Sequence, residues 1–269
     1  MKLGFIGLGN MASAMIGGIL KKGLVEAEDI IGSDKSKAGC EKAAQQFGIA
    51  TYRDNKQVAA EADILFFAVK PIFLPEVMEE IKSSLREETV IVSIVAGKTI
   101  AFLEEGLGRC DSGRNRKIVR CMPNTPALVG EGCTGVCANF EVYPGEMEQV
   151  LELLSSFGVA QEVPERLMDA VVGVSGSAPA YVFMFIEAMA DAAVAAGMPR
   201  GQAYTFAAQA VLGSAKMVLE TGKHPGELKD MVCSPGGTTI DAVKVLENKG
   251  FRAAVMEAID ACVEKSKKL

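Results

Sequence analysis

The chain has 269 residues, which allows one large domain or two modest ones. Apolar residues make up 49% of it and charged residues 23%, the composition of an ordinary globular protein. The net charge of −6, with both signs interspersed, argues against a nucleic-acid partner, because such proteins present a basic face. The single histidine, His224, excludes a paired-histidine metal site and leaves little room for a Ser-His-Asp triad.

The seven cysteines are scattered and form no C-x-x-C pair. This pattern is typical of reduced thiols in a cytosolic protein, so we expect plain buried cysteines. Cys133 and Cys137 are close in sequence, but no second pair or histidine completes a metal site. We therefore expect no bound metal.

The N-terminus has a strand-like run broken at once by glycines, unlike a signal peptide. The most apolar stretch, residues 181–197, carries Glu187 and Asp191 and is shorter than the ~20 residues of a membrane span. We expect a cytoplasmic protein that binds no membrane.

The first part of the chain alternates short apolar runs with amphipathic ones. The runs predict strands at residues 2–6, 29–32, 63–69, 89–95 and 117–122, and helices at 11–22, 35–47 and 75–85. Residues 134–138 and 159–162 are candidate edge strands around a helix at 146–157. Apolar strands alternating with helices indicate an α/β fold, a Rossmann-type doubly wound sheet covered on both faces.

After Pro164 the pattern becomes helical, with no convincing strand. Helices are expected at residues 165–172, 179–196, 200–220, 225–231, 239–249 and 251–267. Several are apolar on more than one face and the bundle is thin, so we expect a second copy of the chain to cover it. The predicted domains are residues 1–163, which bind the dinucleotide, and residues 164–269, an all-α domain for dimerisation and substrate binding.

Gly7-Leu8-Gly9-Asn10-Met11-Ala12 directly follows the first strand and opens the first helix. This is the G-x-G-x-x-A form of the dinucleotide-binding fingerprint. Gly7 permits a tight turn, Gly9 lets the backbone approach a pyrophosphate, and Ala12 lets helix and strand pack closely. The helix N-terminus offers N–H groups to the phosphates. The alternative is a plain tight turn, but the surrounding β-α-β pattern favours a dinucleotide.

The end of the second strand, where the adenosine ribose of a dinucleotide binds, carries Asp34. A carboxylate there binds the ribose diol and favours NADH. Ser33, Lys35 and Lys37 would instead receive the 2′-phosphate of NADPH. A third interpretation is a solvated turn in which Asp34 caps the next helix.

Two further loops follow later strands and face the same crevice. They consist of Ala68, Val69, Lys70 and Pro71 in one case, and of residues 93–97 in the other. Position alone distinguishes them from ordinary turns.

In the helical half, Ser234-Pro-Gly-Gly-Thr-Thr239 predicts a tight loop in which Thr238 or Thr239 caps the next helix. Such a loop suits a carboxylate, although an ordinary inter-helix turn has the same chemistry. Residues 175–181 predict a similar loop, with Ser177 as N-cap and Pro179 in the first turn.

The run from Pro225 to Glu247 resembles the signature of pyrroline-5-carboxylate reductases. So do four shorter motifs, in the same order as in that family: residues 7–11, 68–71, 122–126 (Met-Pro-Asn-Thr-Pro) and 175–181. Together they cover nearly the whole chain. Two departures are Ala178, where the family often has glycine, and Asp34, where many members carry Asn or Ser.

The resemblance implies that NADPH or NADH reduces L-1-pyrroline-5-carboxylate to L-proline in a homodimer. Dimers of the family often assemble further into decamers, so the assembly of this chain is either a dimer or a decamer. It implies that Thr239 acts at the imine nitrogen and that Ser177, Ser234, Gly236, Gly237, Thr238 and Thr239 bind the substrate. It adds Ile6, Asn55, Ile94, Val95 and Ala96 to the expected cofactor residues.

Two other readings remain open. A β-hydroxyacid dehydrogenase would need a helix-borne lysine, and residues 167–215 contain none. A non-catalytic dinucleotide-binding module would leave the Ser234–Thr239 loop without a purpose.

Overall fold

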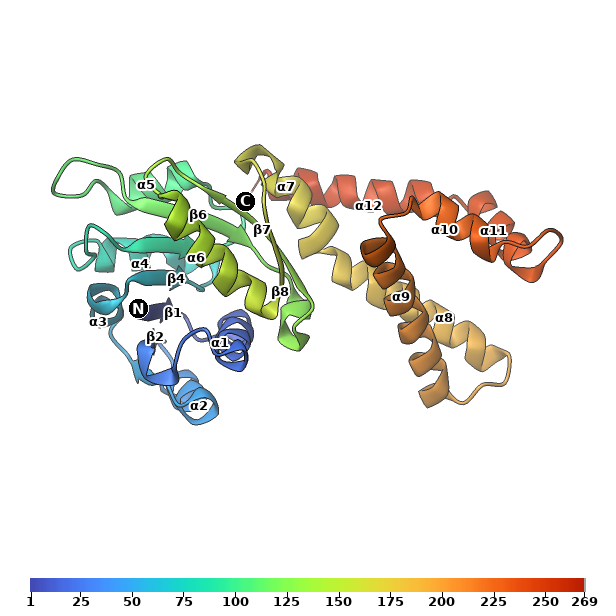
Figure 1. Cartoon of the computed structure of the whole chain (residues 1–269), viewed down its shortest axis with the longest axis horizontal. Coiled ribbons are helices and arrows are strands. Elements are labelled where there is room, and N and C mark those ends of the chain that lie inside the picture. The colour runs from blue at the N-terminus through green and yellow to red at the C-terminus, as the bar shows by residue number, and fades with distance from the viewer. Residues whose placement is uncertain (269) are drawn as a thin grey trace. The chain divides into compact units, whose positions relative to one another are not determined.

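The computed structural model describes residues 1–268 (Figure 1). The chain divides into two compact units. The first consists of Met1–Ser177 and the C-terminal segment from Cys262, and the second of Ala178–Ala261. The domain boundary expected at residue 164 separates a cofactor-binding part from a substrate-binding part. The division into compact units does not test this assignment, so it stays a prediction.

The first unit contains one eight-stranded sheet, in the order β3-β2-β1-β4-β5-β6-β7-β8. All neighbouring strands are parallel except β6 and β7. This confirms the expected α/β fold. The strands are β1 (Leu3–Ile6), β2 (Ile30–Ser33), β3 (Ala50–Tyr52), β4 (Ile64–Phe67), β5 (Val90–Ser93), β6 (Lys117–Met122), β7 (Gly132–Ala138) and β8 (Gly158–Glu162).

Helices cover both faces of the sheet (Figure 1). Ser36 caps one of them by accepting a hydrogen bond from the Gly39 N–H at 3.3 Å. The helices of this unit are α1 (Asn10–Lys22), α2 (Lys37–Phe47), α3 (Asn55–Glu61), α4 (Leu74–Ile81), α5 (Ile100–Leu107), α6 (Pro144–Leu154) and α7 (Met168–Val171).

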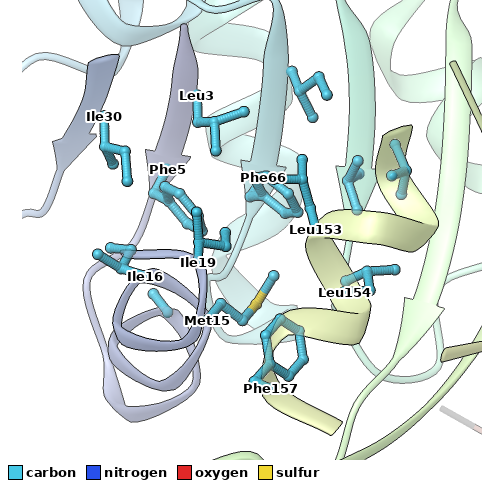
Figure 2. Packing of buried hydrophobic residues seen from close by; sticks show 14 of the residues in the cluster. Leu3, Phe5, Met15, Ile16, Ile19, Ile30, Phe66, Leu153, Leu154 and Phe157 are labelled. Carbon is cyan, nitrogen blue, oxygen red and sulfur yellow. The ribbon is translucent and has the colours of Figure 1, made fainter. Parts of the chain in front are cut away.

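Two apolar clusters, one on each face, hold the sheet between its helices. In the first, the rings of Phe5 and Phe66 stack with centroids 4.6 Å apart on adjacent strands. Figure 2 shows Met15 and Ile19 of α1 directed at these rings, with Phe157 beside Met15. Because β1 and β4 are buried on both faces, their sequences are continuously apolar rather than alternating.

Three elements were not expected. Strand β3 has three residues, too few for a periodic signal. Helices α3 and α5 are short, although each begins after a capping side chain, Asp54 and Thr99 respectively. The expectation that residues 134–138 form an edge strand is wrong: β7 lies between β6 and β8, because it pairs with both along its length.

Four cysteines are buried as expected: Cys40, Cys110, Cys121 and Cys137. Burial raises the pKa of the Cys137 thiol to about 12 and that of Cys121 well above its ordinary value. The expectation is wrong for Cys133, which is exposed because it lines a groove beside Leu167 and Val174. Cys233 and Cys262 are half-buried. Residues 1–268 contain no group of three His, Cys, Asp or Glu side chains that could hold a metal ion.

The second unit is helical, and no strand occurs in the described residues after Glu162. Its helices are α8 (Ala178–Ala195), α9 (Arg200–Thr221), α10 (Pro225–Val232) and α11 (Thr238–Asn248), followed by α12 (Phe251–Ser266), which continues into the first unit. Helices α8 and α9 pack together, and Phe185 of α8 approaches Phe251 of α12 with ring centroids 6.0 Å apart.

Large apolar side chains of these helices remain exposed. Phe183 and Met184 on α8 are 63% and 68% exposed, and Phe206 on α9 is 65% exposed. By length and composition, the helical segment Glu165–Ala195 is also apolar enough to cross a membrane. The helices of this unit are thus too few to cover one another's apolar side chains.

Candidate cofactor and substrate sites

A pocket of about 280 Å³ lies where β1, β2 and β4 end. The carboxyl ends of parallel strands are the usual ligand-binding edge of this fold. Ten of its lining residues were expected from the sequence: Ile6, Gly7, Gly9, Ser33, Asp34, Lys35, Asn55, Ala68, Val69 and Lys70. The structure therefore brings four separate sequence segments to one place.

The two glycines of the fingerprint have different roles. Gly7 has φ +95°, and a Cβ there would lie 2.6 Å from the Ala68 carbonyl oxygen, so the tight turn requires glycine. Gly9 precedes α1, and a Cβ there would meet no atom within 4 Å. The space above Gly9 is thus open at the start of a helix, as backbone contact with a pyrophosphate requires.

The other fingerprint residues support the loop. Leu8 is buried against Gly32, and Ala12 is buried in the first turn of α1. Met11 packs partly against the core, and Asn10 is exposed at the first position of α1. These four residues do not line the pocket.

Asp34 connects the Gly-rich loop to the turn that follows β2. Its Oδ2 accepts the Leu8 N–H at 3.0 Å and its Oδ1 accepts the Ser36 N–H at 2.8 Å. Ser36, not Asp34, is the N-cap of α2, so the interpretation of Asp34 as the helix cap is wrong. The carboxylate instead holds the Gly-rich loop against the end of β2.

A polar chain crosses the pocket wall from Ser33 to Glu80. The buried Ser33 hydroxyl donates to Asn55 Oδ1 at 2.8 Å, and Asn55 Nδ2 donates to Glu80 Oε2 at 2.8 Å. Asn55 is thereby held at the start of α3 with its side chain facing the pocket.

Phe73 and Val77 also line the pocket and were not expected. The strand-to-helix turn after Pro71 ends at Phe73, and α4 carries Val77 on its buried face. The spacing of Leu74, Val77, Met78 and Ile81 is that of a buried helix face. It does not reveal that the first turn of this helix also lines the pocket. Pro71 begins the turn without lining the pocket.

Ile94, Val95 and Ala96 follow β5, the neighbour of β4, and lie on the same edge of the sheet. Val95 is buried in one core cluster and Ile94 packs partly against the other. None of the three lines the pocket.

The expected substrate loop lies in the second unit. The Gly237 N–H donates to the Ser234 carbonyl at 3.0 Å, which closes a tight turn with Gly236 at φ +68°. The N-cap of α11 is Gly237, so the expectation that Thr238 or Thr239 caps this helix is wrong. The turn leaves both threonines inside the first turn of α11, with Thr239 half-buried and Thr238 exposed.

Ser177 is also not an N-cap. Its backbone is helical (φ −95°, ψ −24°) and it ends the π-helical turn Val172–Gly176, because its N–H bonds the Val172 carbonyl at 2.8 Å. The Ser177 hydroxyl lies 3.0 Å from Cys262 Sγ. His224 is exposed at the N-cap of α10, where its Nδ1 accepts the Gly226 N–H.

Each half of the chain matches a known protein family. Residues 165–269 match the family "Pyrroline-5-carboxylate reductase dimerisation", and residues 2–97 match "NADP oxidoreductase coenzyme F420-dependent". The chain is 56% identical to the pyrroline-5-carboxylate reductase of Escherichia coli K12, over 100% of this chain and 98% of that protein. The chain belongs to the pyrroline-5-carboxylate reductase family.

Solved structures of this family have the same fold. The Plasmodium falciparum pyrroline carboxylate reductase with NADP bound superposes with a TM-score of 0.89 at 36% identity, covering 100% of this chain and 97% of that one. The Coxiella burnetii pyrroline-5-carboxylate reductase gives 0.91 at 34%, covering 99% and 97%. The family membership suggested by the motifs is thus confirmed.

Proposed function

We propose that this chain uses NADPH or NADH to reduce L-1-pyrroline-5-carboxylate to L-proline, the last step of proline biosynthesis. The observation that carries the proposal is full-length similarity at 56% identity to a reductase of that name. The dinucleotide-type pocket at the end of β1 supports the cofactor half of the reaction. In this proposal residues 1–163 bind the cofactor and residues 164–269 bind the substrate and dimerise.

The residues of the pocket fit a dinucleotide. The open space at Gly9 beside the N-terminus of α1 suits the pyrophosphate, and Asp34 and Lys35 lie where the adenosine ribose would bind. When bound, the nicotinamide supplies the hydride that the imine carbon accepts. The loops that end in Lys70 and Ala96 would border the nicotinamide end.

Thr239 is the proposed catalytic residue. Its Oγ1 would either hydrogen-bond the imine nitrogen or relay a proton to it from water. Ser177, Ser234 and the backbone of Gly236, Gly237 and Thr238 would hold the substrate carboxylate. A cyclic imine can arrive already protonated, so the site needs no strong acid. Alignment of the two reactants would supply most of the rate enhancement.

The helical domain is proposed to form a homodimer, in keeping with the family description of residues 165–269 as a dimerisation region. The exposed apolar side chains of α8 and α9 support this, because a dimer interface would remove the apolar surface of both helices from water. A second copy covers such a surface in water, so we propose a cytoplasmic protein without a membrane or nucleic-acid partner. Further assembly of dimers into decamers is part of the proposal.

The reaction is tested by following the loss of NADH or NADPH absorbance when pyrroline-5-carboxylate is added to the purified full-length protein. Imine-dependent oxidation of either coenzyme is the expected result. Oxidation of a β-hydroxyacid with NAD⁺ or NADP⁺ would instead favour a dehydrogenase. Coenzyme binding without turnover of either substrate would favour a non-catalytic module.

A further inference from the structure

The carboxylate of Asp34 is fixed on three sides. Its two oxygens accept the N–H groups of Leu8 and Ser36, at 3.0 and 2.8 Å. Gly39 lies on the third side, close enough that a Cβ there would be 3.1 Å from the Asp34 Cγ. The carboxylate therefore cannot turn away from an approaching ligand without breaking bonds to both loops.

This fixed charge faces the dinucleotide pocket. Asp34 lines it together with Gly7 and Gly9, and directly follows β2. The residue at that position of a Rossmann sheet meets the adenosine ribose. Each carboxylate oxygen that accepts one N–H retains a lone pair, so Asp34 can still accept a ribose hydroxyl.

Three cationic residues close to Asp34 each interact with another group. The Lys35 ammonium lies 3.1 Å from Glu76 and 5.3 Å from the centre of the Phe73 ring. Lys37 lies 3.5 Å from Glu41, and the Arg53 guanidinium donates to the Lys35 carbonyl at 3.2 Å. The fixed charge directly after β2 is thus negative, whereas the positive charges of Lys35, Lys37 and Arg53 sit on long, exposed side chains.

We propose that Asp34 makes this pocket selective for a dinucleotide with a free 2′-hydroxyl, NADH, over its 2′-phosphorylated counterpart, NADPH. A 2′-phosphate would bring a second anion against a carboxylate that cannot move, whereas a 2′-hydroxyl donates to it. The inference rests on the proposed function only in that the pocket binds a dinucleotide. A relative of 36% identity was solved with NADP bound, so the selectivity is assigned to this chain and not to the family.

Calorimetric titration of the full-length protein with ADP and with 2′,5′-ADP tests the selectivity without any redox reaction. We expect the Kd for ADP to be lower by about tenfold or more. Asp34→Asn removes the charge but keeps the side-chain size and an acceptor for Leu8. It should reduce the preference for ADP to within about threefold.

A matched control accompanies this variant. Asp54→Asn, a carboxylate that caps α3 without lining the pocket, should leave the ratio unchanged.

Equal or tighter binding of 2′,5′-ADP by the unmodified protein would overturn the inference, and this comparison needs no variant to fold. An unchanged ratio in a folded Asp34→Asn protein would overturn it as well. Absence of binding of either nucleotide would overturn the pocket assignment together with the selectivity. Preference for ADP without any turnover of the imine would support the selectivity and contradict only the proposed reaction.

Discussion

The buried Asn124 amide donates from Nδ2 to both the backbone carbonyl and the hydroxyl of Ser175, at 3.2 Å each. Its Oδ1 accepts the Cys133 N–H at 2.8 Å, and the Ser175 hydroxyl donates to the Cys133 carbonyl. One side chain thus ties the segment after β6 to the start of β7 and to the π-helical turn Val172–Gly176. Such π turns are rare and need specific partners for their displaced backbone groups.

Asn124→Ala should destabilise the protein by about 2 kcal/mol, because it leaves buried partners without hydrogen bonds. Urea denaturation at one fixed protein concentration measures this, since dimerisation makes stability depend on concentration. Asn124→Asp keeps the acceptor for Cys133 and loses the donors to Ser175, so it separates the two contacts. A change below about 0.5 kcal/mol in the free energy of unfolding of the alanine variant would show that Asn124 does not hold these segments together.

Gly7→Ala and Gly9→Ala should have different effects on folding stability and on dinucleotide affinity. Gly7 has φ +95° against the Ala68 carbonyl, so its substitution should cost at least about 1 kcal/mol of folding free energy as well as cofactor binding. Gly9 has open space and an ordinary φ of −76°, so Gly9→Ala should fold normally and lose only dinucleotide affinity. Thermal unfolding and NADH titration, run on both variants, make the comparison. Equal losses of stability would show that the open space at Gly9 has been misassigned.

Thr239→Ala should lower kcat about tenfold or more while leaving NAD(P)H affinity nearly unchanged, because the hydroxyl is assigned to the imine and not to the cofactor. Thr238→Ala is the matched control, since that hydroxyl belongs to the neighbouring residue of the same helical turn. Thr239→Ser should restore much of the rate. Unchanged turnover in Thr239→Ala would remove the catalytic role and leave the family membership intact.

Asp63 should make stability depend on pH in the acid range. The Lys2 backbone N–H, bonded at 2.8 Å, is the main cause of the lowered pKa of this carboxyl, and Arg86 adds to it. A folded pKa below the unfolded value of about 3.9 stabilises the protein above that pH, and the stabilisation is lost as pH falls through the folded pKa.

The comparison is between unmodified protein and Asp63→Asn. The variant should be less stable by about 1 kcal/mol at neutral pH, a value reduced by the partial exposure of the side chain. The difference should shrink progressively below about pH 4, as urea midpoints would show. A difference that stayed constant with pH would mean that packing, and not charge, is responsible.

Phe183→Lys should dissociate the proposed dimer, because this ring lies 63% exposed on α8 and is expected to be covered by the second copy. Phe140→Lys, which replaces a fully exposed ring of the sheet unit, is its control and should leave the mass in solution unchanged. Light scattering after size-exclusion chromatography measures the mass of both variants. A dimeric Phe183→Lys protein would place the interface elsewhere.

Local sequence predicted most elements of this fold well. The strand at residues 117–122 has the expected bounds, and the helix expected at 200–220 is α9, one residue longer. The signal was strong for β6 because its residues are buried along almost the whole strand, and for α9 because Pro199 precedes the helix and Gly222 ends it. It was weak for β3, whose three residues are stabilised by pairing with β2 rather than by their own pattern.

The sequence by itself determined the Gly-rich loop, its neighbouring strands and the family, because turn glycines, apolar strand runs and signature motifs act over a few adjacent residues. Only the tertiary structure decided that Asp34 bonds Leu8, that Asn124 holds Ser175, and that Phe73 and Val77 complete the pocket. These contacts join segments separated in the chain, so no local pattern encodes their distance or direction. Composition first excluded histidine-based chemistry, and the fold then showed where a dinucleotide pocket lies instead.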